Sequence, residues 1–239
     1  MSNADVIPAP AVPRIPVRGG GSFPVHRIYC VGRNFAEHAR EMGSEPADPA
    51  ARGTPVLFCK PADAVLTSGE VPYPPGTTEL HHEVELVVAL GRDAPPGVLD
   101  RATAQALVFG CTVGLDLTRR DLQAQAKAKG GPWDTAKAFD ASAPVGELVP
   151  AGDIGALDAL ELALQVDGQL RQQGLLRDMI WDVPDILLEL SRLFALKAGD
   201  LVFMGTPAGV GPLQPGQSFR ASLGGDIAVL EGRILPIGH

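Results

Sequence analysis

The sequence contains no apolar segment near the ~20 residues that a membrane-spanning helix needs, and this excludes a spanning helix. Basic residues are also few, with 20 Lys and Arg against 28 Asp and Glu. The formal net charge of -8 argues against nucleic acid as a partner and favours small molecules. The N-terminus is rich in Pro and Gly and lacks the continuous apolar segment of a secretory signal, so we expect a cytoplasmic protein.

Cysteine is scarce as well, with three in 239 residues. Cys30, Cys59 and Cys111 each lie in an apolar, strand-like stretch, and no two of them form a CxxC pair. We therefore expect three buried, reduced thiols rather than disulfides or a zinc site.

The remaining composition, 45% hydrophobic and 20% charged, is typical of a folded globular chain. We expect residues 1–25 to form an irregular arm and residues 26–239 to form one domain. Short apolar segments broken by Gly and Pro predict strands at 55–60, 82–90, 107–117 and 200–205. The chain is therefore mostly β, without the regular βαβ alternation of a nucleotide-binding sheet.

Three local patterns add detail to this fold class. Asp167-Gly168 between two strand-like segments predicts a type I′ hairpin turn. Helices are predicted over 119–129, where Gly130 would end the helix, and over 182–196, where Pro184 suits a first turn. The glycines of GTPAGVGP at 205–212 are expected to serve turns, because a phosphate loop would need a GK[ST] sequence.

Two carboxylates, Glu83 and Glu85, interrupt the apolar segment LHHEVELVVAL at 80–90. In a strand they would share one face, about 6.5 Å apart along the backbone. An edge strand with one face in water would explain this pair alone. Asp116 adds a third acid in an apolar stretch, and buried like charges need a compensating cation or protons. Oxygen ligands without cysteine favour Mg²⁺ or Mn²⁺.

Zinc, with His81 as a further ligand on the same face, is the competing hypothesis for this cluster. It is weaker because no second well-spaced histidine is present, and core or surface roles are expected for His81 and His82. Upstream, His38 and Glu41 are three residues apart and would share one face of a helical turn. An imidazole oriented by a carboxylate can take a proton from water near neutral pH, although a solvated helix face is the alternative.

The order and spacing of several motifs resemble the fumarylacetoacetate hydrolase family, in particular its short acylpyruvase and fumarylpyruvate hydrolase branch. The motifs are IYCVGRNFAEHAREMG, LFCKPADAV, LHHEVELVVALG, GLDLTRRDLQ, GGPWDTAKAFDASAPVG and GDLVFMGTPAGVGPL. The similarity extends from about Arg27 to about Ile234. It implies an α+β, mostly β fold, a β-roll with a few flanking helices, and a homodimer.

The resemblance also implies roles for individual residues. The implied metal ligands for Mg²⁺ or Mn²⁺ are Glu83, Glu85 and Asp116, the implied catalytic residues are His38, Glu41 and Lys137, and the implied substrate-binding residues are Arg119, Gln123 and Thr206. Each of the last four residues also has a plainer alternative, as a surface charge, an exposed polar group or a turn residue. Arg120 is expected to be a helix-surface charge, and Lys60 and Arg33 to support the site.

The implied activity is metal-dependent cleavage of a carbon-carbon bond in an acylpyruvate, a 2,4-dioxo acid. His38, held by Glu41, would activate the water that attacks C4, and Lys137 would add positive charge near the oxyanion. Fumarylpyruvate, an intermediate of aromatic catabolism, is the expected substrate. Alternatives on the same scaffold are oxaloacetate decarboxylation and isomerisation of 2-hydroxyhepta-2,4-diene-1,7-dioate. A non-catalytic module with a structural cation is a third. Arg33 and the segment around Met42 are candidates for contacting the acyl group.

Overall fold

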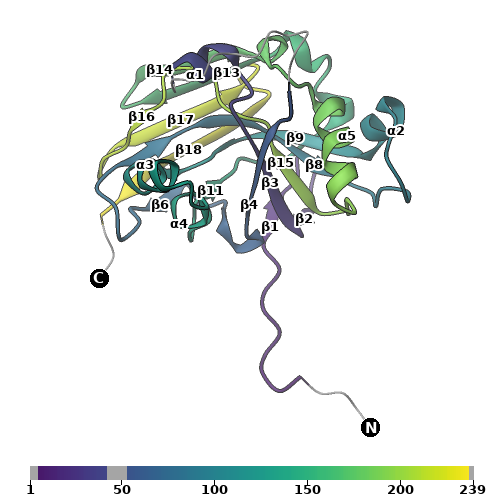
Figure 1. The fold of residues 1–239 in the computed structure, drawn as a ribbon, viewed down its shortest axis with the longest axis horizontal. Coiled ribbons are helices and arrows are strands. Elements are labelled where there is room, and N and C mark those ends of the chain that lie inside the picture. Colours follow the sequence, from purple (N-terminus) through teal and green to yellow (C-terminus); the bar gives the residue numbers. More distant parts are fainter. Residues whose placement is uncertain (1–4, 42–52, 237–239) are drawn as a thin grey trace.

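The structure is a computed structural model that describes residues 5–41 and 53–236 (Figure 1). Its central six-stranded sheet has the spatial order β12 (Val149–Pro150), β9 (Val108–Leu115), β8 (Val84–Leu90), β15 (Asp200–Phe203), β3 (Arg27–Gly32) and β4 (Val56–Lys60). A five-stranded sheet follows the order β14 (Gln169–Leu175), β13 (Glu161–Val166), β17 (Ser218–Leu223), β18 (Ala228–Leu235) and β6 (Glu70–Pro72). The mostly β fold predicted from the sequence is confirmed.

Smaller sheets and short helices surround these two. The smaller sheets are β10 (Thr118–Arg119) with β7 (Leu80–His82) and β16 (Gly211–Pro212), β11 (Ala143–Pro144) with β5 (Val65–Leu66), and β1 (Arg14–Pro16) with β2 (Ser22–Pro24). The helices are α1 (Ala36–Glu41), α2 (Arg101–Leu107), α3 (Arg120–Lys129), α4 (Asp134–Lys137) and α5 (Val183–Leu193). No helix among the described residues is long and apolar enough to cross a membrane.

Strand β8 lies inside the six-stranded sheet, and all seven of its residues are buried. Alternate residues such as Leu86 and Val88 face the core between the two large sheets, where β8 and β9 contact β13, β17 and β18. Val87 and Ala89 face a second core on the opposite side of the same sheet. Because both faces are covered, the strand has a nearly continuous apolar sequence, and Glu85 is buried within it.

Part of the N-terminal arm folds into a hairpin, so the irregular arm predicted for residues 1–25 is wrong over residues 14–24. Strands β1 and β2 pair antiparallel with Ile15 opposite Phe23. Both side chains are buried in the second core, at 0% and 7% exposure. Three-residue strands are too short to give a readable alternation of apolar and polar residues, and this hid the hairpin from sequence analysis.

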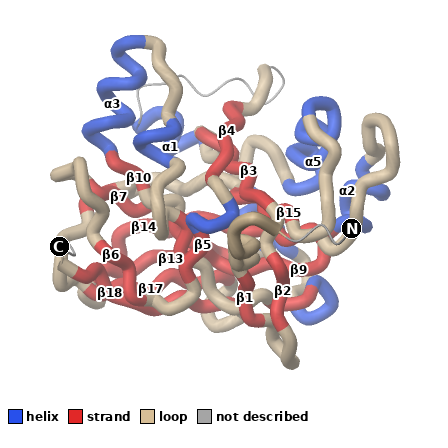
Figure 2. Tube along the Cα trace, turned by 90° about the horizontal axis from the view of Figure 1, so that it is seen from below, coloured by secondary structure: helices blue, strands red, loops and turns tan. Residues whose placement is uncertain are grey.

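The local predictions for one hairpin and two helices are confirmed. Asp167 and Gly168 join β13 to β14 with φ angles of 50° and 73°, as a type I′ turn requires. Helix α3 ends at Gly130, which has a left-handed conformation. Helix α5 packs against α2 at one end of the molecule (Figure 2). Helix α2 has seven residues, too few for an apolar helical face to repeat, so no periodic pattern predicted it.

The three cysteines are free, as predicted, but they are not all buried. Cys30 and Cys111 lie on strands inside the six-stranded sheet and are buried. Cys59 lies on β4, the edge strand of that sheet, and is exposed. The prediction of a buried Cys59 is therefore wrong, because the apolar sequence of β4 did not reveal that the strand lies at an edge.

Candidate active site

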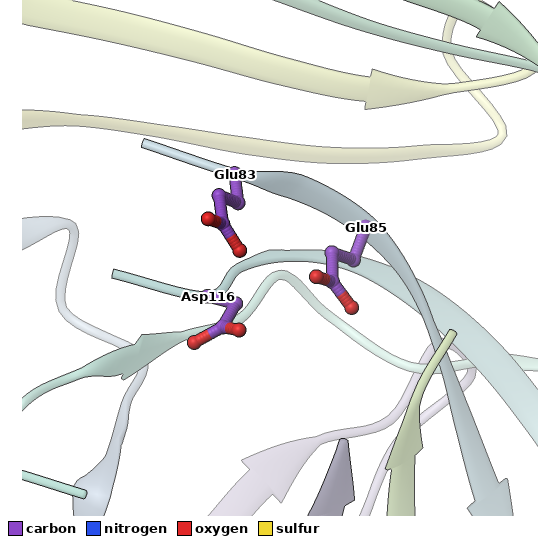
Figure 3. Close-up of side chains that lie close together, drawn as sticks. All are labelled: Glu83, Glu85 and Asp116. Carbon is purple, nitrogen blue, oxygen red and sulfur yellow. The ribbon is translucent and has the colours of Figure 1, made fainter. Parts of the chain in front are cut away.

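The three carboxylates predicted as metal ligands lie together where β8 begins and β9 ends (Figure 3). The two strands are antiparallel, and the Asp116 N–H donates a 2.8 Å hydrogen bond to the Glu83 carbonyl. This register places Asp116 beside Glu83, with Glu85 two residues further along β8. Each residue offers an oxygen within 4.8 Å of the others, and all three side chains are buried.

Buried cations neutralise two of these carboxylates. The Lys137 ammonium donates to Glu83 Oε2 at 2.7 Å and to Asp116 Oδ2 at 2.5 Å. Burial alone lowers the pKa of Lys137, but Asp116 and Glu83 outweigh it and raise this pKa above its usual value. Lys60 Nζ lies 2.9 Å from Asp116 Oδ1, and Arg120 Nη2 lies 2.5 Å from Glu83 Oε1. Lys60 and Lys137 are each only 2% exposed, so neither is a surface lysine.

Glu85 is the carboxylate that has no cation beside it among the described residues. Its Oε2 accepts a 2.7 Å hydrogen bond from the Gly205 N–H, and its side chain is 2% exposed. Burial, followed by the charges of Asp116 and Glu83, raises the pKa of Glu85 well above its usual value. Three buried carboxylates with oxygens within 4.8 Å of one another, one of them without a cation beside it, suit a divalent cation, so the residues fit Mg²⁺ or Mn²⁺.

The histidines near this cluster do not support the zinc hypothesis. Within the described residues, the group that could hold a metal consists of the three carboxylates alone. The ring nitrogen Nδ1 of His82 is 2.8 Å from the side-chain oxygen of Gln172, and His81 Nδ1 accepts from Arg120 Nε at 3.4 Å. Both imidazoles therefore have structural partners.

His38 and Glu41 lie on α1 and face each other as predicted. His38 Nδ1 is 3.3 Å from Glu41 Oε2, and Glu41 also accepts from the Gly209 N–H at 3.3 Å. Burial lowers the pKa of His38, although the charge of Glu83 and the contact with Glu41 oppose that effect. The imidazole is therefore neutral at pH 7, the form that can accept a proton.

One pocket joins the carboxylates to most of the predicted residues. Besides the three carboxylates, its lining includes His38, Lys137, Gln123 and Thr206. Gln123 and Thr206 are only 3% and 2% exposed, so neither is an ordinary surface residue. The three carboxylates line this pocket, whereas protein ligands would surround the cation of a closed structural site.

Arg120, rather than the predicted Arg119, is the arginine that lines the pocket. The Arg119 guanidinium lies 4.4 Å from the centroid of the Phe139 ring and donates to the Thr135 carbonyl at 3.0 Å, and Arg119 does not line the pocket. Arg120 does line it, pairs with Glu83 and donates to Gln123 Oε1 at 2.6 Å. Arg119 ends β10 and Arg120 begins α3, so one position along the chain reverses the direction of the side chain.

Lys127 is a pocket residue that sequence reasoning missed, although a signal was available. It lies four residues after Gln123 and seven after Arg120, so the three residues share one face of α3. Lys127 Nζ is 5.4 Å from the centroid of the Trp133 ring. Arg33 lines the same pocket, with a left-handed backbone at φ 59°. Met42, the other candidate for contacting the acyl group, lies outside the described residues.

The fold and this site define a class of protein: a β scaffold with three buried carboxylates, suited to a divalent cation, that line a small pocket. The model of the fumarylacetoacetate (FAA) hydrolase C-terminal family matches residues 27–235. The chain therefore belongs to the fumarylacetoacetate hydrolase family, as its motifs predicted.

Named relatives differ in the activity given to them. The mitochondrial oxaloacetate tautomerase FAHD1 of Arabidopsis thaliana is 41% identical over 220 residues, covering 88% of this chain and 93% of that protein. The mitochondrial oxaloacetate decarboxylase of Dictyostelium discoideum is 39% identical over 202 residues, covering 83% and 89%. The crystal structure of fumarylpyruvate hydrolase from Pseudomonas aeruginosa, in complex with Mn²⁺ and pyruvate, matches with a TM-score of 0.91 at 41% identity, covering 98% of this chain and 100% of that one.

Proposed function

We propose that this chain is a metal-dependent enzyme that acts on a 2-oxo dicarboxylate through its enolate, with oxaloacetate as the principal substrate. The observation that carries the proposal is the buried set of Glu83, Glu85 and Asp116 at the base of a pocket that also contains His38 and Lys137. The curated relatives named for oxaloacetate tautomerisation and decarboxylation favour this substrate over the acylpyruvate expected from the sequence. A Mg²⁺ or Mn²⁺ ion held by the three carboxylates would supply Lewis-acid stabilisation of negative charge on the 2-oxo group.

The chain's own residues provide the positioning and the proton transfer. Arg120 and Lys137 place positive charge around the anionic substrate, and Gln123 and Thr206 orient it by hydrogen bonds. In tautomerisation, the enol loses its hydroxyl proton and C3 gains one, and the neutral imidazole of His38 can carry that proton. In decarboxylation, the C3–C4 bond breaks and C4 leaves as CO₂. The electron pair of that bond forms the pyruvate enolate, which is then protonated at C3.

Two further cations support a substrate with a second carboxylate. Arg33 and Lys127 line the pocket, and neither has a carboxylate partner within the described part of the chain. Burial lowers the pKa of Lys127, and the positive charges of Arg120 and Arg33, which line the same pocket, lower it further. An uncompensated pair of cations in a substrate pocket favours a dianionic ligand such as oxaloacetate or fumarylpyruvate over an acylpyruvate with a neutral acyl group.

Hydrolysis of fumarylpyruvate is the second candidate, and the His38–Glu41 pair favours it. In this reaction His38 removes a proton from water, the resulting hydroxide attacks C4, and the C3–C4 bond breaks to give fumarate and the pyruvate enolate. The Pseudomonas aeruginosa relative is named for this activity. Enolate formation is common to both candidates, and they differ in whether water is activated.

Parallel assays of the Mn²⁺-loaded protein would test these activities. Enol absorbance follows tautomerisation of oxaloacetate, pyruvate release follows decarboxylation, and chromatography follows fumarate released from fumarylpyruvate. We expect oxaloacetate turnover above the rate with Mn²⁺ alone, and we expect chelation or Glu85→Gln to abolish it. Fumarate release without oxaloacetate turnover would establish the second candidate instead. A metal-bound protein inactive on both substrates would be a binding module and would overturn the proposal.

Assembly as a homodimer and location in the cytoplasm remain predictions. Light scattering of the purified chain tests the first, and the expected mass is twice that of the monomer. Imaging or fractionation of the tagged protein in its own cells tests the second.

A further inference from the structure

A buried amide lies directly behind the pocket, outside the carboxylate cluster. Gln172 belongs to β14 and is 1% exposed. Its Oε1 accepts the Val84 N–H at 3.0 Å, and its Nε2 donates to the Pro207 carbonyl at 2.8 Å. A backbone N–H can only donate and a carbonyl can only accept, so these two partners fix which end of the amide carries oxygen and which carries nitrogen.

The fixed amide determines the hydrogen-bonding role of Thr206. Gln172 Nε2 also lies 2.7 Å from Thr206 Oγ1. Because the amide nitrogen can only donate, the Thr206 oxygen must accept this hydrogen bond, and its own O–H proton must point elsewhere. Thr206 is 2% exposed and lines the pocket, and no described residue accepts from its hydroxyl. The remaining direction for that O–H is into the pocket.

His82 extends the same chain of hydrogen bonds. Its Nδ1 is 2.8 Å from Gln172 Oε1, which acts as an acceptor, so Nδ1 carries the proton. His82 is 1% exposed. Gln172 Oε1 thus receives two donors, from Val84 and His82, and rotation of the amide by 180° would place its N–H groups against both of them. All four hydrogen bonds of the Gln172 amide are therefore consistent with this one orientation.

We propose that Gln172 is a positioning residue that makes the Thr206 hydroxyl a dedicated hydrogen-bond donor to an anionic oxygen of the bound 2-oxo acid. This inference rests on the proposed function, because it assigns a ligand oxygen to that hydroxyl. Gln172 occupies one lone pair of the Thr206 oxygen and leaves the O–H proton without a protein acceptor among the described residues, so the hydroxyl presents that proton to the substrate. It therefore favours a carboxylate or enolate oxygen over a neutral group that would itself donate.

The test compares Gln172→Glu with Thr206→Val in Mn²⁺-loaded protein. The glutamate has the shape of glutamine but presents an acceptor to Thr206, so the Thr206 hydroxyl turns away from the pocket. Valine keeps the shape of threonine without its hydroxyl. We expect each variant to weaken pyruvate binding, measured by calorimetry, and kcat/KM by roughly tenfold, the effect of one hydrogen bond to a charged group. We expect Thr206→Val to leave Mn²⁺ binding within about threefold, since Thr206 is not a ligand and the change adds no charge.

The double variant Gln172→Glu with Thr206→Val separates positioning from a purely structural role. If Gln172 acts through the Thr206 hydroxyl, the double variant binds pyruvate no more weakly than Thr206→Val alone. If Gln172 acts only by packing, the two losses multiply to roughly a hundredfold, and the inference is overturned.

Gln172→Met provides a second measurement should the glutamate variant fold poorly. Methionine leaves the Thr206 hydroxyl free to rotate, so we expect a loss of about two- to threefold, smaller than the loss with glutamate. Thr206→Ser keeps the hydroxyl and should bind pyruvate more tightly than Thr206→Val. A methionine loss as large as that of Thr206→Val would contradict the inference. Wild-type protein that binds Mn²⁺ but neither binds nor converts any 2-oxo acid would instead defeat the proposed function on which it rests.

Discussion

Among the three clustered carboxylates, Glu85 is the one that no described cation pairs with, and this has a measurable effect on stability. Glu85→Gln keeps the size of the side chain and removes a buried charge that has no neighbouring cation. We expect the metal-free variant to melt at or above the wild-type temperature. Mn²⁺ at a hundred times Kd should raise the free energy of unfolding of the wild type by about 2.7 kcal/mol, and with it the melting temperature, and should leave the variant unchanged.

Glu147→Gln is the matched control for this comparison, because Glu147 is a half-exposed carboxylate that pairs with Arg18. Its melting temperature should respond to Mn²⁺ as the wild type does. An equal Mn²⁺ shift in Glu85→Gln and Glu147→Gln would show that Glu85 is not a ligand.

The two adjacent arginines give a paired prediction for activity. Arg120→Ala removes a guanidinium that lines the pocket and contacts Glu83 and Gln123, so we expect kcat/KM to fall by about 30- to 100-fold. Arg119→Ala removes a contact with Phe139 outside the pocket, and we expect kcat/KM within about threefold of the wild type. The opposite order of losses in steady-state kinetics would reverse the assignment made from the structure.

Sequence patterns could identify Glu83, Glu85 and Asp116, because acids inside apolar strands are unusual and the family motifs repeat their spacing. They could not separate Arg119 from Arg120, because the direction of each side chain depends on where a strand ends and a helix begins. Gln172 lies in the polar segment QLRQQG, where most neighbours are exposed, and nothing in that segment indicates that one glutamine is buried. Its role depends on contacts with residues that are distant in sequence.

At the scale of elements, the β1–β2 hairpin contributes to the core despite its short strands. Ile15 is fully buried there, so Ile15→Ala should lower the free energy of unfolding by about 2–5 kcal/mol. Ile7→Ala is the control, because Ile7 precedes the hairpin and is 69% exposed. We expect its effect to stay within about 0.5 kcal/mol. Chemical denaturation measures both, and equal stabilities would show that the hairpin does not pack as described.

The sequence predicted longer elements better than short ones. The hairpin at Asp167-Gly168 and helix α5 each carry a strong local signal, a turn dipeptide in one case and an apolar helical face in the other. The β1–β2 hairpin and helix α2 are stabilised mainly by what they pack against, which a local pattern does not contain.

At the scale of the whole molecule, the burial of the thiols reports on global unfolding. Cys30 and Cys111 are buried, and burial raises the pKa of Cys111 to about 12. At pH 8 neither thiol is ionised or accessible, so the folded Cys59→Ser variant should take up no iodoacetamide. The unfolded variant should take up two labels, because both thiols regain ordinary pKa values near 8.5 in the denatured chain. Intact mass spectrometry counts the labels, and labelling of the folded variant would disprove the burial.

The contact of Lys137 with both Glu83 and Asp116 affects the order in which the protein folds and binds its metal ion. A tethered ammonium already satisfies these acids, so the polypeptide can reach its native state before any ion arrives. A divalent ion that binds to the folded protein must then compete with the Lys137 ammonium for the oxygens of Glu83 and Asp116. Occupancy in the cell should accordingly follow the supply of free divalent ion, while folding of the chain should not require that ion.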